Sequence, residues 1–142
     1  MEYDHIITNM LLLSFILSCR VKEAKAWAVG PSHYEFNIEN SMSHGVILSV
    51  HCMANEADLG PIRLPMHKNY THGFKTEMFK TTRYYCDVTA PGRVQKVFDT
   101  FRDVIEFVDH ECGGRHCFWK VMDDGIYLYH IQKQKYFKKY NW

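Results

Sequence analysis

The sequence has no hydrophobic run long enough to cross a membrane. Its most apolar stretch, Met10–Leu17, holds about eight residues, whereas a helix that spans the hydrocarbon layer needs roughly 20. The stretch is followed by Ala24-Lys25-Ala26, a small-x-small pattern of the kind that signal peptidase cleaves. We therefore predict a secretory signal peptide at residues 1–26 and a mature domain at residues 27–142 that begins with Trp27.

The predicted signal is atypical in one respect. Secretory signals usually begin with basic residues, but residues 1–9 contain Glu2 and Asp4 and neither Lys nor Arg. The alternative is a buried amphipathic helix at the N-terminus. Residues 6–17 show no polar face at a 3.6-residue period, so such a helix would have no side to turn towards water. We therefore expect export, without stable insertion into a membrane.

The sequence also has no excess of charge of either sign. It contains 17 Lys and Arg residues against 16 Asp and Glu residues, a formal charge of +1. The predicted cleavage removes equal numbers of basic and acidic side chains, so the charge of residues 27–142 is unchanged. Such a balance is not that of a general nucleic-acid binder, and we expect no nucleic-acid partner. The length of the mature chain is that of one domain.

Motifs of common hydrolases and nucleotide-binding enzymes are missing. There is no Gly-x-Ser-x-Gly turn and no His-Glu-x-x-His helix, and Gly113-Gly114 follows no phosphate-loop pattern. The nine histidines are compatible with a ribonuclease that uses a paired acid and base, with His51 and His116 as the residues to test. They show no repeated spacing, which is typical of exposed or structural histidines. We predict no enzymatic activity and no cofactor.

Export would leave an even number of cysteines in the mature chain. Five cysteines are present, and Cys19 leaves with the predicted signal peptide. The other four, Cys52, Cys86, Cys112 and Cys117, form an even set that we expect to make two disulfides in an oxidising compartment. The sequence leaves all three pairings open, although a strained local Cys112–Cys117 loop is less attractive than two long-range bridges.

A zinc site is the alternative for the segment from His110 to Cys117. Its imidazole and thiol groups are suitable zinc ligands, but their spacing matches no common structural finger. Thiols of a secreted protein are also expected to be oxidised. We therefore predict no metal site.

Asn69-Tyr70-Thr71 is an N-glycosylation sequon. In a secreted chain such a sequon requires an exposed loop, and this one follows Pro61 and Pro65. We predict that Asn69 carries a glycan.

Short segments with period-two alternation recur from residue 34 onward, and none has a sustained 3.6-residue period. This pattern predicts an all-β fold, a small disulfide-bonded β-sandwich of about seven strands. We expect turns at residues 40–45, 80–81 and 123–125, and a polar stretch without a strand at residues 55–69. The expected inward-facing sets are Tyr34, Phe36 and Ile38; Val46, Leu48, Val50 and Cys52; Phe74, Thr76 and Met78; Tyr84, Cys86 and Val88; Cys117, Trp119 and Val121; and Ile126 and Leu128. A further strand is expected at residues 97–101.

Two details of this sandwich follow from the same alternation. Cys52, Cys86 and Cys117 share inward faces with apolar residues, which favours bridges buried between the two sheets. Val104–Asp109 fits one helical turn as well as a strand, and we leave it unassigned.

Several short motifs occur in order between residues 34 and 129. They are FNIEN at 36–40, LSVHC at 48–52, DLG at 58–60, TTRYYC at 81–86, FDTFRD at 98–103, CFW at 117–119 and DGIY at 124–127. Each is weak alone, but their combination in this order is hard to obtain by chance. Together they resemble the plant self-incompatibility proteins, or S-protein homologues.

The resemblance implies a small secreted β-sandwich held by two disulfides. The best-known members of this family are stigma proteins that act as ligands for a receptor on incompatible pollen, and most homologues have no such established role. For this chain it implies an extracellular signalling ligand whose partner is a plant cell-surface receptor. We expect the protein to be a monomer.

The chain departs from the family pattern at two places. Met53–Ala57 stands where the family often has a Ser- and Asp-rich loop, and Arg83 stands where an apolar residue is usual. Alternation places Arg83 on the face opposite Tyr84 and Cys86, in solvent, so no buried charge results. We expect the fold to survive both changes.

Three segments are candidate binding surfaces, because loops on a rigid scaffold tolerate change. They are Asn55–Lys68, Val104–Arg115 and the tail Lys133–Trp142. The tail combines lysines with aromatic residues, which would suit an anionic interface, so the alternative function is a secreted defence protein that binds microbial membranes. A final edge strand with solvated lysines is the commoner explanation of such a tail.

Overall fold

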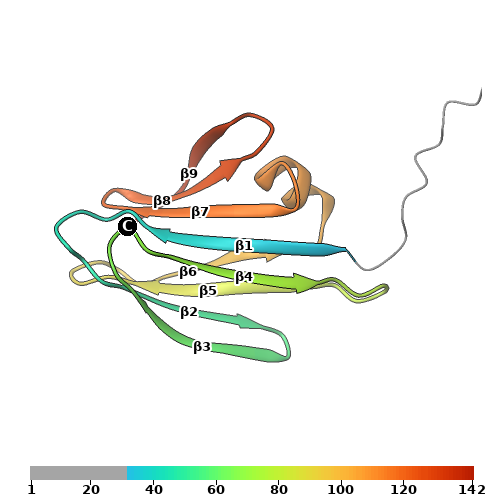
Figure 1. The fold of residues 1–142 in the computed structure, drawn as a ribbon, viewed down its shortest axis with the longest axis horizontal. Helices are drawn as coiled ribbons and strands as arrows, with labels where there is room; N and C mark the ends of the chain where they lie inside the picture. The colour runs from blue at the N-terminus through green and yellow to red at the C-terminus, as the bar shows by residue number, and fades with distance from the viewer. Residues whose placement is uncertain (1–31) are drawn as a thin grey trace, which may run out of the picture.

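Alternating apolar residues place the described part of the chain, residues 32–142, in two sheets that pack face to face in this computed structural model (Figure 1). The predicted signal peptide, Cys19 and Trp27 lie outside the described residues. The five-stranded sheet contains, in spatial order, β4 (Asn69–Lys75), β1 (His33–Asn40), β7 (His116–Met122), β8 (Gly125–His130) and β9 (Lys135–Asn141). The four-stranded sheet contains β3 (Ala57–Leu64), β2 (Leu48–Ala54), β5 (Arg83–Thr89) and β6 (Lys96–Arg102).

The core lies between the sheets and is built from the inward face of each strand. Trp119 of β7 is 2% exposed, and its indole Nε1 donates a hydrogen bond to the carbonyl oxygen of Thr100, at 3.1 Å. Every buried side-chain nitrogen or oxygen of the described residues has a hydrogen-bond partner, as a dry core requires. The largest fully buried apolar side chains besides Trp119 are Phe36, Phe101, Ile38, Leu48, Ile126, Leu128, Val50, Val88 and Val121.

The predicted all-β sandwich is confirmed, with more strands than expected. The structure has nine strands over residues 32–142, because the stretch expected to be irregular forms β3 and the tail forms β9. Gly60 and Pro61 argue against a strand, yet β3 lies at the edge of its sheet, where a missing N–H costs no ladder hydrogen bond. β9 is the final edge strand that the lysines and aromatic residues of the tail indicated.

One inward-facing set was wrong at its end. β4 stops at Lys75. Thr76 is buried as expected, and its N–H donates to the carbonyl oxygen of Ser32 at 2.9 Å. Met78 is 46% exposed instead of buried. The loop that follows leaves the sandwich and returns only at β5 (Figure 1).

Both disulfides are buried in the core between the sheets, as the inward-facing cysteines predicted, but neither joins one sheet to the other. Cys52 bonds to Cys86, its direct cross-strand neighbour on β5, so this bridge lies within the four-stranded sheet. The other bridge is the local Cys112–Cys117 pair, which the sequence argument disfavoured. The chain can reverse over so short a span because Gly113 adopts a positive φ of 71°. A Cβ at Gly113 would lie 2.5 Å from His130 Nδ1, so the close approach also needs glycine.

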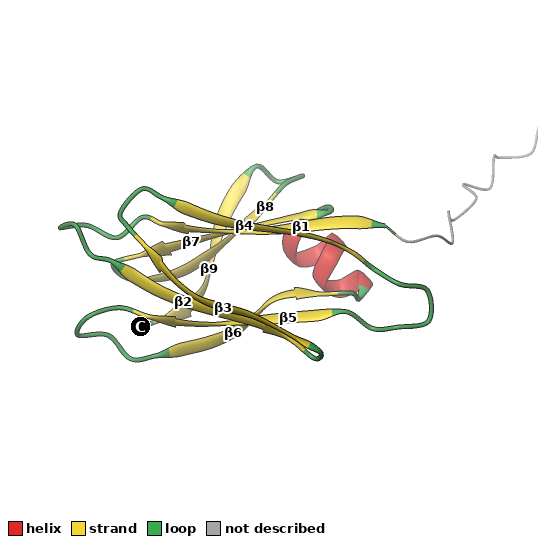
Figure 2. Ribbon diagram, turned by 60° about the horizontal axis from the view of Figure 1, so that its bottom comes forward, coloured by secondary structure: helices red, strands yellow, loops and turns green. Residues whose placement is uncertain are grey.

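The unassigned segment, Val104–Asp109, leads into a short π-helix, η1 (Glu106–Cys112), and supplies its first residues. Figure 2 shows it at one end of the sandwich, between the planes of the two sheets. It ends at Gly113, and the N–H of Gly114 donates to the carbonyl oxygen of Val108, at 2.9 Å. The disulfide then fixes the last residue of η1 to the start of β7.

A buried asparagine at the end of β1 connects the two sheets. The side-chain Nδ2 of Asn40 donates to the carbonyl oxygens of Val46 and Leu64, each at 2.8 Å, and its Oδ1 accepts the N–H of Met42 at 3.1 Å. Leu64 belongs to β3 of the opposite sheet, and Val46 leads into β2. Asn40 is fully buried, so these three backbone groups rely on its side chain for a hydrogen bond in place of water.

His72 of β4 is a half-buried histidine at the margin of the core. Its ring centroid lies 5.1 Å from that of Tyr84 and 5.9 Å from that of Phe74, against which it stacks. Burial among these rings lowers the pKa of His72 below its usual value near 6.5, because the charged form is poorly solvated there.

We predict that replacing Asn40 destabilises the fold strongly. Asn40→Ala leaves two carbonyl oxygens and one N–H unpaired, and Asn40→Asp places a carboxylate against both carbonyl oxygens. Each should lower the free energy of unfolding by about 3 kcal/mol, measured by urea denaturation. The matched control is Asn37→Ala on the outer face of the same strand, which loses one solvent-facing bond to Thr71 and should change it by less than about 1 kcal/mol. Equal effects of the two alanine variants would contradict this account.

We also predict that His72 makes the fold sensitive to acid. Because its pKa is lowered in the folded state, the unfolded chain binds more protons below pH of about 6.5, and stability falls as pH falls through that value. His72→Phe keeps an aromatic ring but takes up no proton. Thermal unfolding between pH 7.5 and 5 should therefore show a smaller loss of Tm for His72→Phe than for the wild type. An identical loss in both proteins would refute the role of His72.

Candidate functional site

A cleft of about 350 Å³ opens at the end of the sandwich where the two sheets and η1 meet. Its walls come from β6, from the segment that leads into η1, from η1 itself and from β9, and β7 contributes to its base. The residues that line it are Asp99, Arg102, Val104, Glu106, Phe107, Glu111, Trp119, Lys139 and Tyr140.

The base of the cleft is aromatic. Phe98 packs against Trp119 with 4.7 Å between ring centroids and against Tyr140 with 5.3 Å. Trp119 is almost fully buried, whereas Tyr140 is 38% exposed. A partner group that enters the cleft therefore meets the ring of Tyr140, which is held in place from behind by the core.

Charged side chains of both signs form the rim. Asp99 accepts from Arg83 at 2.7 Å and lies 3.6 Å from Arg102, and Glu111 pairs with Lys139. The pKa of the Tyr140 hydroxyl is raised, first by burial and then by the nearby carboxylates of Asp99 and Glu111. Exposed pairs of this kind add little stability, but they fix a pattern of charge that a complementary surface can read.

The cleft has no catalytic constellation. No histidine, cysteine or serine is among its lining residues, and two of its acids, Asp99 and Glu111, are paired with basic side chains. Its chemistry is that of a binding surface with an aromatic centre and a polar rim, which is the usual anatomy of a protein interface.

The structure brings two of the three predicted surfaces together at this cleft. Residues 104–115 supply η1 and its approach, and the tail supplies Lys139 and Tyr140. The third surface, residues 55–68, is mostly β3, at the far edge of the four-stranded sheet.

The lysines of the tail are individually engaged. Lys138 lies 3.1 Å from Asp124 and Lys139 pairs with Glu111, while Lys133 and Lys135 lie over the ring of Phe137, at 5.4 and 5.6 Å. The tail is thus the outer strand of a sheet and not a separate basic segment. Within residues 32–142, no helix has the length and apolar character needed to cross a membrane.

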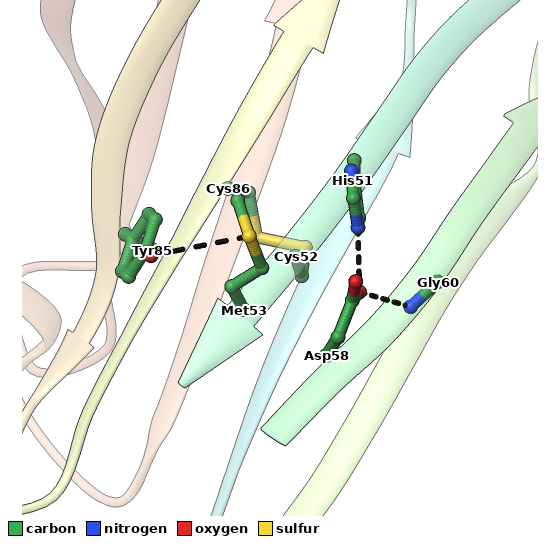
Figure 3. Close-up of polar contacts among 7 residues, drawn as sticks. All are labelled: His51, Cys52, Met53, Asp58, Gly60, Tyr85 and Cys86. Carbon is green, nitrogen blue, oxygen red and sulfur yellow. Dashed lines mark hydrogen bonds and ion pairs between the residues drawn. A yellow bond between two sulfur atoms is a disulfide. The ribbon is translucent and has the colours of Figure 1, made fainter. Parts of the chain in front are cut away.

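The two histidines considered for acid and base catalysis point away from each other. His51 lies between the inward-facing Val50 and Cys52, so its side chain is on the outer face of the four-stranded sheet, where Nε2 is 2.5 Å from Asp58 (Figure 3). His116 precedes the inward-facing Cys117 and lies on the outer face of the other sheet. With a whole sandwich between them, His51 and His116 cannot act as one acid and base pair.

The environment of His51 is a small polar cluster beside a disulfide. Asp58 Oδ1 also accepts the N–H of Gly60 at 2.8 Å, and these contacts lower the pKa of Asp58, with His51 as the largest cause. Figure 3 shows this cluster on one side of the Cys52–Cys86 bridge. It braces β2 against β3, because His51 and Asp58 come from these neighbouring strands.

The structure also places the residues of the alternative zinc site and the predicted glycan acceptor. Cys112 and Cys117 are bonded to each other, so neither sulfur is available as a thiolate. Asn69 is exposed at the start of β4, an edge strand, and the hydroxyl of Thr71 accepts from Asn37 at 2.6 Å. The sequon lies on a strand and not in the loop that the prolines indicated; its glycosylation stays a prediction.

Arg83 is where alternation predicted, on the solvent side of β5. Its side chain is 50% exposed and is paired with Asp99. Sequence reasoning missed the cleft that this pair borders, because its walls come from segments far apart in the chain. It also missed Asn40, although a signal was available: Asn40 continues the inward-facing series of Phe36 and Ile38.

The model of the family described as "Plant self-incompatibility protein S1" matches residues 35–142. S-protein homolog 1 of Arabidopsis thaliana is 31% identical over 98 residues, which cover 69% of this chain and 64% of that protein. Self-incompatibility protein S1 of Papaver rhoeas is 27% identical over 136 residues, covering 89% and 91%. S-protein homolog 24 of Arabidopsis thaliana is 28% identical over 138 residues, covering 96% and 87%. The matched part of the chain thus spans less than two-thirds of S-protein homolog 1 but nearly all of the Papaver rhoeas protein.

Proposed function

Because the chain belongs to the plant self-incompatibility protein S1 family, as its motifs predicted, we propose that it is an extracellular signalling ligand of a plant cell-surface receptor. The observation that carries the proposal is the cleft, where two candidate surface segments converge on an aromatic base with a charged rim. Such a surface is suited to recognition by another protein.

Export is part of this proposal. Residues 1–26 are the signal peptide, and residues 27–142 are released as a monomer with a glycan at Asn69. Two buried disulfides support this assignment, because such bonds persist outside the cytosol and are rare within it. A pollen–pistil role is one form that such signalling takes in the family, and the receptor binding proposed here does not depend on it.

The protein acts by binding and not by catalysis. The separation of His51 and His116 supports this view, as does a cleft whose lining residues include no histidine, cysteine or serine. Metal chemistry is not part of the proposal either, because residues 32–142 contain no group of three His, Cys, Asp or Glu side chains placed to hold an ion.

Reversing charge at the cleft should impair receptor binding. Arg102 is 52% exposed on the rim and can be changed to Glu without disturbing the core. We expect Arg102→Glu to weaken the saturable binding of labelled protein to plasma-membrane vesicles of the source plant at least tenfold (about 1.4 kcal/mol). The reason is that an acidic group of the receptor that faces Arg102 would then meet a charge of the same sign. The matched control is Arg63→Glu on β3, also exposed and expected to bind as the wild type does.

The two variants also separate competing surfaces. Loss of binding in Arg63→Glu with normal binding in Arg102→Glu would move the contact to residues 55–68. If the wild-type protein shows no saturable binding to these vesicles, the proposed ligand function is wrong. Thermal unfolding of both variants must match the wild type, so that a change in binding reports on the surface alone.

A further inference from the structure

The loop between β4 and β5 carries an apolar tip that faces solvent. Phe79 is fully exposed, and its neighbour Met78 is 46% exposed. Figure 1 shows this connection projecting beyond the end of the strands. A fully exposed aromatic ring makes no packing contact with its own domain, so burial within the domain does not explain its presence.

The backbone at the tip is unfavourable for the residue it carries. Phe79 has a φ of 66°, in the left-handed region that glycine and asparagine tolerate and bulky residues avoid. The domain therefore accepts conformational strain for a side chain that contributes no internal contact. Strain of this kind, observed at an exposed position, is a reason to look for function there.

The loop is braced on both sides of the tip. The ammonium of Lys80 lies 2.8 Å from the carboxylate of Glu56, which belongs to the β2–β3 turn. At the start of the loop, Thr76 and Ser32 are joined through their backbones and through the Thr76 hydroxyl. The tip is thus presented from a defined base, which reduces the entropy lost when a partner binds.

The charge around the tip distinguishes a protein from a lipid surface. The walls of the hollow behind the tip contain three basic residues, Lys75, Lys80 and Arg83, and two acidic residues, Glu56 and Glu77. Asp99 pairs with Arg83 and makes the numbers of basic and acidic groups equal. A segment that binds an anionic membrane needs an excess of cations near the surface. A small apolar centre inside a rim of both signs is instead the pattern of an anchor residue at a protein interface.

The tip is also continuous with the proposed binding cleft. Arg83 lines the hollow behind the tip, and its guanidinium pairs with Asp99 on the cleft rim at 2.7 Å. The two features therefore belong to one end of the sandwich and can contact the same partner.

We propose that Phe79, supported by Met78, is a hydrophobic anchor that inserts into an apolar pocket of the partner protein. This inference rests on the proposed function and adds to it a contact outside the cleft. Glu77 and Lys80 form the polar rim that surrounds the anchor in the complex.

The decisive variant is Phe79→Gly, because it separates binding from stability. Glycine relieves the left-handed conformation, so Tm should stay the same or rise, whereas saturable binding to plasma-membrane vesicles should weaken at least tenfold. Phe79→Asn tests the same point with a side chain that tolerates this conformation. The matched control is Val97→Ser, which removes another exposed apolar side chain (60% exposed, on β6) and should bind normally.

Three further measurements test whether the tip binds a protein, a lipid surface or a second copy of this chain. Wild-type binding should disappear when the vesicles are treated with protease, and should be absent from liposomes made of their extracted lipids. Sedimentation should show the same monomer for the wild type and Phe79→Gly. Liposome binding that Phe79→Gly abolishes, or a wild-type dimer that it dissociates, would overturn the assignment to a protein pocket.

The outcomes distinguish the anchor from the proposed function. Saturable wild-type binding that Phe79→Gly leaves unchanged, or that Val97→Ser weakens equally, overturns the anchor and leaves the receptor ligand in place. An absence of saturable wild-type binding overturns the proposed function and the anchor with it.

Discussion

The pairing of four buried cysteines is the constraint on which this structure depends. Cys52–Cys86 fixes β2 to β5 at the centre of one sheet, and Cys112–Cys117 fixes η1 to the first residues of β7. Each disulfide contributes about 2 to 4 kcal/mol by restricting the unfolded chain, against a total stability of about 5 to 15 kcal/mol for an ordinary domain. Such bonds persist in an oxidising compartment, and the two disulfides therefore support the export that we propose.

The disulfides do not hold the two sheets together, and other interactions do so. The apolar faces supply most of the attraction between the sheets, while Asn40 sets their relative position at one end by binding backbone carbonyls of the opposite layer. At the other end, η1 contacts strands of both sheets and forms a wall of the cleft. Rigid strands thus carry the proposed binding surface, whose residues lie in η1, in the tail and in the β4–β5 loop.

Period-two alternation was sufficient to predict the sheet class, most of the inward faces and the exposed position of Arg83, because these depend on local geometry. It failed where a local preference was overridden by position in the sheet: β3 tolerates Pro61 only because it is an edge strand. The cysteine pairing could not be chosen from spacing, since the local bridge depends on the backbone of Gly113. The cleft could not be predicted because its walls come from segments that are distant in the sequence. The exposure of Phe79 could not be predicted either, because an apolar residue in a sequence gives no sign that its loop projects from the domain.

The central claim is that the chain is exported and that its four mature cysteines are paired as in the structure. Mass spectrometry of the protein released by plant cells tests it most directly, with proteolysis under non-reducing conditions. The account predicts an N-terminus at Trp27, one peptide pair joined through Cys52 and Cys86, and a Cys112–Cys117 bridge. An intracellular chain that still begins at Met1 and has free thiols at all four positions would contradict it.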